Sequence, residues 1–151
     1  MKPFATLAAV IALALATAST AQAGIQLSKI LSNPAVAPVG QTLTNAEFVV
    51  VKNTDSKAKN LRGWFIREKH SERTFTFPGF SLCGGCSVKI HSGTGTNTAS
   101  DLYWGRAKQA WANDSDKAIL HRAAGFIQDT CVYPKPTAGV PPPTLGKTFS
   151  C

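Results

Sequence analysis

The pattern of apolar residues after residue 24 is the strongest constraint on the fold. No helical period of useful length occurs there, and short runs rich in β-branched and aromatic residues recur between turn residues. In one run, Val88 and Ile90 alternate with Lys89 and His91, as in a strand with one buried face. Such runs predict an all-β sandwich or barrel, with strands at residues 25–31, 46–52, 63–69, 73–77, 86–91, 118–122 and 126–133.

Two segments fall outside this pattern. Residues 92–105 are rich in Gly, Thr, Ser and Asn, which predicts a long connection over one end of the fold. Residues 134–151 are rich in proline and poor in core-forming residues. They predict an extended C-terminal tail that cannot fold alone.

The N-terminal segment, residues 1–23, has the layout of a secretory signal peptide. It has one charge at Lys2, an apolar run over residues 5–16, and the small-x-small sequence Ala21-Gln22-Ala23 before the expected cut. The apolar run is shorter than the roughly 20 residues that span a bilayer, and an uncleaved anchor is the alternative. We predict a secreted, extracellular protein with a domain at residues 24–133 and no membrane span in the mature chain.

A series of short motifs runs in order through the predicted domain. The motifs are residues 45–53 (NAEFVVVKN), 61–64 (LRGW), 75–79 (FTFPG), 87–93 (SVKIHSG), 103–105 (YWG) and 111–120 (WANDSDKAIL). In this order they resemble the lamin-tail domain, which occurs in nuclear lamins and in secreted bacterial proteins. The resemblance implies an immunoglobulin-like β-sandwich and covers residues 25–133.

Three of the motif residues have a clear role in folding. Trp64 is large enough to anchor contacts between two sheets. Asn53 can close a turn by bonding to the backbone two residues on. Glu47 stands at a strand entrance, where backbone or lysine partners can reach it, whereas the other acidic residues are expected mostly in turns.

The four cysteines predict disulfide bonds, because export exposes thiols to oxidising conditions. Cys83 and Cys86 span a four-residue turn that brings them within disulfide reach. No helix follows them, which argues against a redox-active pair. Three pairings are open to four cysteines; we expect neighbours to pair, so that Cys131 and Cys151 tie the tail to the last strand.

The sequence predicts no catalytic, cofactor or metal site. The histidines His70, His91 and His121 lack zinc-ligand spacing, and we interpret them as solvated or hydrogen-bonded. Residues 113–116 alternate oxygen ligands but lack the glycine and the distal glutamate of a calcium loop, which favours a turn. The glycine-rich residues 93–96 precede no helix and are interpreted as a flexible loop.

Basic residues are concentrated in residues 52–73, which hold seven of the sixteen lysines and arginines in a chain of net charge +8. They suggest a polyanion-binding site, for DNA or an anionic polysaccharide, at Lys57, Lys59, Arg62 and Arg67. A solvated face that keeps the protein soluble is the alternative interpretation.

Taken with the resemblance, these features predict a secreted, non-enzymatic binding or adhesion module for an extracellular or cell-surface macromolecule. Rival hypotheses are the polyanion binder, with nucleic acid among its partners, and a small hydrolase. A third is a polysaccharide binder that stacks sugars on Tyr103, Trp104 and Trp111, although buried tryptophans are the preferred interpretation.

Overall fold

The computed structural model describes residues 24–37, 39–133 and 146–151. The predicted signal peptide, residues 1–23, and most of the predicted tail, residues 134–145, lie outside the described residues. In the described part, no helix is long and apolar enough to cross a membrane.

The described residues form strands and one short helix, α1 (Leu43–Ala46). The strands are β1 (Ile25–Leu31), β2 (Phe48–Asn53), β3 (Lys59–Asn60), β4 (Phe65–Glu68), β5 (Thr74–Thr76), β6 (Ser81–Leu82), β7 (Ser87–His91), β8 (Asp101–Tyr103), β9 (Asp116–His121), β10 (Ile127–Tyr133) and β11 (Thr148–Ser150).

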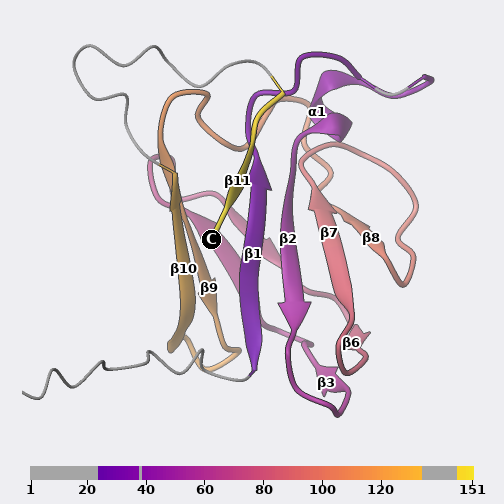
Figure 1. The fold of residues 1–151 in the computed structure, drawn as a ribbon, viewed down its shortest axis with the longest axis vertical. Coiled ribbons are helices and arrows are strands. Elements are labelled where there is room, and N and C mark those ends of the chain that lie inside the picture. The colour runs from indigo at the N-terminus through magenta and orange to yellow at the C-terminus, as the bar shows by residue number, and fades with distance from the viewer. Residues whose placement is uncertain (1–23, 38, 134–145) are drawn as a thin grey trace, which may run out of the picture.

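Two sheets pack face to face (Figure 1). One has the strand order β11-β1-β2-β7-β8 and the other the order β10-β9-β4-β5, while β3 and β6 form a small ribbon at one end. All pairings are antiparallel except β7 with β8, which is parallel. This architecture confirms the predicted all-β, immunoglobulin-like sandwich.

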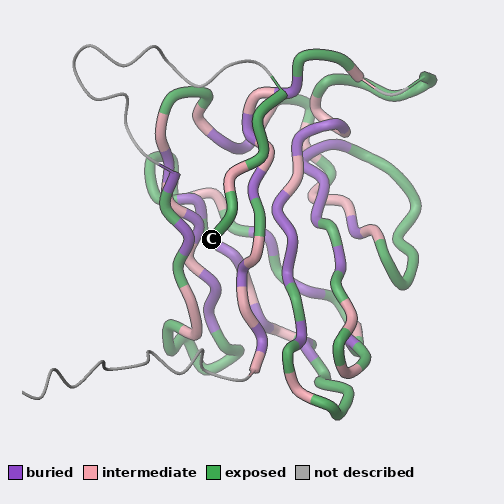
Figure 2. Tube along the Cα trace, in the orientation of Figure 1, coloured by how far each residue is buried: buried purple, intermediate pink, exposed green. Residues whose placement is uncertain are grey.

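The core lies between the sheets and follows the alternation expected of strands (Figure 2). Val49 and Val51 of β2 are fully buried, and so are Ile66 of β4 and Leu120 of β9 in the opposite sheet. Trp64, which precedes β4, is 8 % exposed and belongs to the core cluster. The prediction that Trp64 anchors the core is confirmed.

A β-bulge at Ser28 decides which side chains of β1 face the core. Leu27 pairs with Val51 and Lys29 with Val50, so that Ser28 is the extra residue. Because of this shift Leu27 and Ile30 both point inward, while Lys29 points out. The bulge therefore places a lysine on the outer face of the sheet.

Hydrogen bonds at or next to the sheet edges join the two sheets on both sides. On one side, the Leu27 amide donates to the Asp129 carboxylate of β10 at 2.8 Å. On the other side, the indole Nε1 of Trp104, just after β8, donates to the Thr74 carbonyl of β5 at 3.0 Å. Neither open side of the sandwich is left without a bond between its sheets.

The disulfides pair as expected, Cys83 with Cys86 and Cys131 with Cys151. The second bond links β10 of one sheet to the residue that follows β11 of the other. Beside it, the rings of Tyr133 and Phe149 stack with their centroids 4.9 Å apart. This disulfide therefore joins the two sheets at their edge.

The elements that the sequence did not predict are all short. β8 lies in the stretch predicted as a connection, residues 92–105, and β11 lies in the stretch predicted as a tail. Helix α1, β3 and β6 were not predicted either. Each spans two to four residues, and a run so short has no detectable period of its own.

Replacing Trp64 with alanine should lower the free energy of unfolding by about 3–5 kcal/mol, because a large side chain leaves a cavity in the core. Urea denaturation followed by circular dichroism measures the change. A midpoint close to that of the wild type would contradict the role of Trp64 as a core anchor.

The double variant C131S/C151S should lose about 3 kcal/mol of stability, since its disulfide closes a loop with a sequence separation of 20. The matched control C83S/C86S opens a loop with a separation of 3 and should lose less. If urea denaturation shows equal losses of stability in the two double variants, the Cys131–Cys151 disulfide is not the more stabilising of the two bonds.

Candidate functional site

Three acidic side chains are buried at one end of the sandwich: Glu47, Glu68 and Asp116. They are at most 3 % exposed, although carboxylates are seldom buried without partners. The expectation that the acidic residues lie mostly in turns was wrong, because strands contain four of them: Glu68, Asp101, Asp116 and Asp129. Burial on this scale requires hydrogen bonds to every carboxylate, and the structure supplies them.

Glu47 accepts bonds from two distant parts of the chain. The Ser92 hydroxyl and the Ala110 amide donate to Oε2, the latter at 2.6 Å, and the Trp111 amide donates to Oε1 at 3.3 Å. Burial raises the pKa of Glu47 from 4.5 to about 7, and the three donors only partly oppose it. Glu47 thus holds the connection that leads to β9.

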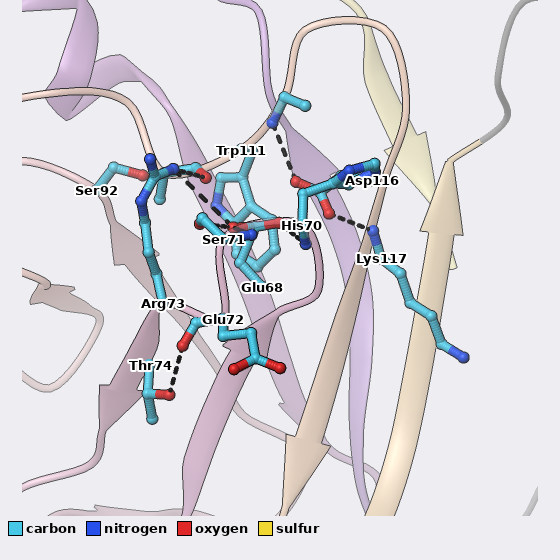
Figure 3. Close-up of polar contacts among 12 residues, drawn as sticks. Glu68, His70, Ser71, Glu72, Arg73, Thr74, Ser92, Trp111, Asp116 and Lys117 are labelled. Atoms are coloured by element: carbon cyan, nitrogen blue, oxygen red, sulfur yellow. Dashed lines mark hydrogen bonds and ion pairs between the residues drawn. The ribbon is translucent and has the colours of Figure 1, made fainter.

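Glu68 and Asp116 belong to the same buried cluster, and each carboxyl affects the pKa of the other (Figure 3). Glu68 accepts from the amides of His70 and Ser71 and from the Ser71 hydroxyl. Burial, together with the nearby Glu68, raises the pKa of Asp116 to about 6. The pKa of Glu68 is lowered because the bonds from Ser71 and Asp116 outweigh burial. As the pH falls, Asp116 therefore takes up a proton before Glu68 does.

The carboxylates of Glu47, Glu68 and Asp116 accept hydrogen bonds from backbone amides. Asp116 accepts from the Ala112 amide at 3.1 Å and from the Lys117 amide at 2.6 Å. Within the described ranges, no three His, Cys, Asp or Glu side chains are grouped so as to hold a metal ion. The arrangement supports a structural role, fixing the connection between β8 and β9 over the core.

The outer face of the five-stranded sheet has a different character. A hollow of about 550 Å³ lies over β1, β2, β7 and β11. We call this hollow the sheet trough; it is lined by Ser28, Lys29, Phe48, Val50, Lys52, Ser87, Lys89 and Thr148. Its walls thus carry three lysines and three hydroxyl groups around an apolar floor.

Strand register arranges the lysines of the trough. Lys29 of β1 and Lys89 of β7 both pair with Val50 of β2, one from each side, and Lys52 lies two residues along β2. All three lysines are exposed. None of them forms an ion pair with any carboxylate in the described part of the chain.

A second hollow, of about 390 Å³, continues the trough and shares Phe48 and Lys89 with it. His91 forms part of its wall, with Nδ1 2.6 Å from the Asn45 carbonyl and Nε2 2.8 Å from Asp101. Both ring nitrogens thus face oxygen atoms of the fold. The bond from His91 lowers the pKa of Asp101.

The residues predicted for polyanion binding do not share one face. Lys57, Lys59 and Arg62 are exposed near the β3–β6 ribbon. Arg67 lies on β4 between the buried Ile66 and Glu68, and so it points out from the four-stranded sheet. The structure brings three of the four to one end and places the fourth on a different surface.

Of the aromatic residues considered for sugar stacking, Trp111 is buried as expected, whereas Tyr103 and Trp104 are half-buried. Trp111 is 3 % exposed, and Trp104 donates to the Thr74 carbonyl. The ring of Tyr103 stacks on the ring of His91 and also lies close to Gly95. The interpretation of a buried Trp111 is confirmed, so this residue offers no face to a sugar.

A comparison with models of protein families matches residues 18–135 to the lamin tail domain. The chain belongs to the lamin tail domain family. Lamin tail domains are non-enzymatic and immunoglobulin-like, in agreement with the two sheets described above. A search of curated proteins returns no match.

Sequence reasoning missed the trough of this lamin tail domain, because its lysines come from three strands. Lys29 and Lys89 are 60 residues apart, and only the pairing of both strands with β2 makes them neighbours. Alternation around Lys89 did indicate an outward side chain. For Lys29 the bulge at Ser28 hides that signal.

The stability of the domain should fall as the pH rises from about 5 to 8. The pKa of Glu47 is higher in the folded state, about 7 against 4.5, so its contribution is full below pH 4.5 and lost as the pH passes 7. The loss should be about 3 kcal/mol or less, and Asp116 acts in the same direction with a pKa of about 6.

Urea denaturation at several pH values measures this slope. In the variant Glu47→Gln, the free energy of unfolding should depend less on pH above about pH 6. In Asp116→Asn, it should depend less on pH below about pH 6. A wild-type stability that is constant or increases over this range would show that Glu47 is ionised without cost in the folded state.

Proposed function

We propose that this lamin tail domain is a secreted, non-enzymatic binding or adhesion module that attaches to an extracellular or cell-surface macromolecule. The sheet trough is the observation that carries the proposal. It is open to solvent, extends over several strands and presents three lysines that form no ion pair with a carboxylate among the described residues. Such a surface attracts an anionic polymer more than a small substrate.

The polar groups elsewhere support the same conclusion. The buried carboxylates have their oxygen atoms bonded to backbone amides and hydroxyls of the fold. Both ring nitrogens of His91 are engaged within the fold, one by the Asn45 carbonyl and the other by Asp101. These groups serve the architecture, and the exposed lysines remain for binding.

A panel of polymers tests the proposal. The purified protein should bind acidic polymers on a biosensor surface at low salt, and neutral dextran should show no binding. Salt should weaken the interaction, because exposed charges are screened beyond roughly 10 Å at 0.1 M ionic strength. Binding to none of the polymers, or shortening of any polymer during incubation, would count against a non-enzymatic binding module.

The second candidate function is a polyanion site in residues 52–73, which their local charge favours. If it exists, reversing Lys57, Lys59, Arg62 and Arg67 to glutamate should abolish binding to duplex DNA and leave the fold intact, since all four are exposed. Each phosphate contact should add about 0.9 to the slope of log affinity against log salt.

Arg67 supplies an internal control for this second candidate. Arg67 lies on a different surface from the other three residues. Reversing the charge of Arg67 alone should therefore weaken DNA binding less than reversing the charge of Lys59 alone. Binding that survives reversal of all four charges, or that ignores salt, would exclude the site.

A further inference from the structure

We infer that the sheet trough is a binding site for an acidic polysaccharide, which lies across β1, β2 and β7 against the wall formed by β11. The inference rests on the proposed function and names the ligand class for that surface. It assigns the binding to Lys29, Lys52 and Lys89 rather than to Lys57, Lys59, Arg62 and Arg67, the four residues chosen from the sequence.

The spacing of the charges suits a polymer with anions at regular intervals. Lys29 and Lys89 stand on one row with β2 between them, so their attachment points are about 10 Å apart by strand spacing. Lys52 lies about 7 Å along β2 from that row. Carboxylates carried by every sugar or every second sugar of a chain recur on a comparable scale.

Residues between the lysines provide the other contacts that a sugar chain needs. Val50 and Phe48 form an apolar floor, on which the C–H face of a sugar ring can lie. Ser28, Ser87 and Thr148 line the same hollow, and their hydroxyls can both donate to and accept from sugar hydroxyls. A ligand recognised by charge alone would not need these groups.

The C-terminal strand β11 completes the site. Leu31 of β1 pairs with Thr148, which brings the Thr148 hydroxyl to the edge of the trough. The Cys131–Cys151 disulfide holds this strand, and the Cys151 amide donates to the Ser28 carbonyl at the bulge at 3.0 Å. The same disulfide and hydrogen bond therefore hold both the β11 wall and the strand segment that carries Lys29.

Other anionic polymers fit the trough less well. Single-stranded nucleic acid needs several aromatic faces for successive bases, and among the residues that line the trough only Phe48 is aromatic. An extended peptide would pair with an open sheet edge, whereas the trough lies on a face. Duplex DNA requires an element that enters its groove.

Isothermal titration calorimetry with oligogalacturonate and with a heparin hexasaccharide tests the inference. The variant K29Q/K52Q/K89Q should bind at least about tenfold more weakly than the wild type, since three exposed ion pairs are lost. The control K57Q/K59Q/R62Q removes the same charge outside the trough and should stay within about twofold. Fully methyl-esterified oligogalacturonate should not bind.

A second variant separates sugar recognition from charge. Thr148→Val keeps the shape of the side chain but removes its hydroxyl, and it should weaken oligogalacturonate binding by about two- to tenfold. Its affinity for polyglutamate of equal charge should not change. Circular dichroism and the melting temperature of each variant confirm that exposed substitutions leave the fold intact.

Three results would overturn the inference: equal weakening by the two triple variants, tighter binding of polyglutamate or duplex DNA than of either sugar, or no binding of either sugar. If the protein still binds another polymer of the panel, the ligand class is wrong and the proposed function stands. If it binds no polymer at all, both are wrong.

Discussion

The buried carboxylate of Glu47 is the interaction on which the rest of the domain depends. It stands at the entrance of β2 and accepts from Ser92, after β7, and from the amides of Ala110 and Trp111. Without this acceptor the two buried amides would lose their partner, which costs about 1–3 kcal/mol for each. The bonds hold a long connection with little regular structure against the core, and Trp111 packs there with Trp104.

The outer face of the five-stranded sheet is available for binding because the fold satisfies its buried polar groups without using the lysines of the trough. Both open sides of the sandwich are joined by bonds between the sheets, through Asp129 and the Cys131–Cys151 disulfide on one side and Trp104 on the other. Buried acids are satisfied by backbone amides rather than by lysines. The lysines of the trough are consequently left facing solvent.

Basic residues therefore occur in two arrangements on the surface: those close together in the sequence, in residues 52–73, and those brought together by strand pairing. Residues 52–73 pass from one sheet to the other, so a cluster in the sequence becomes separated on the surface, with Lys52 and Arg67 on opposite outer faces. Lys29 and Lys89, which are distant in the sequence, become neighbours across β2. We propose that the second arrangement is the functional one, because it combines charge with hydroxyl groups and an apolar floor.

Local features of the sequence determined the sandwich, the buried Trp64, the turn at Asn53 and the pairing of Cys83 with Cys86. The Asn53 side chain does accept from the Asp55 amide, two residues on, at 3.0 Å. Each of these needs only alternation, side-chain size or a short turn, which neighbouring residues encode. The bulge at Ser28, the parallel strand β8, β11 and the burial of Glu68 with Asp116 were decided by tertiary structure. They depend on register and burial between distant segments, and no local pattern specifies which strand will lie beside another.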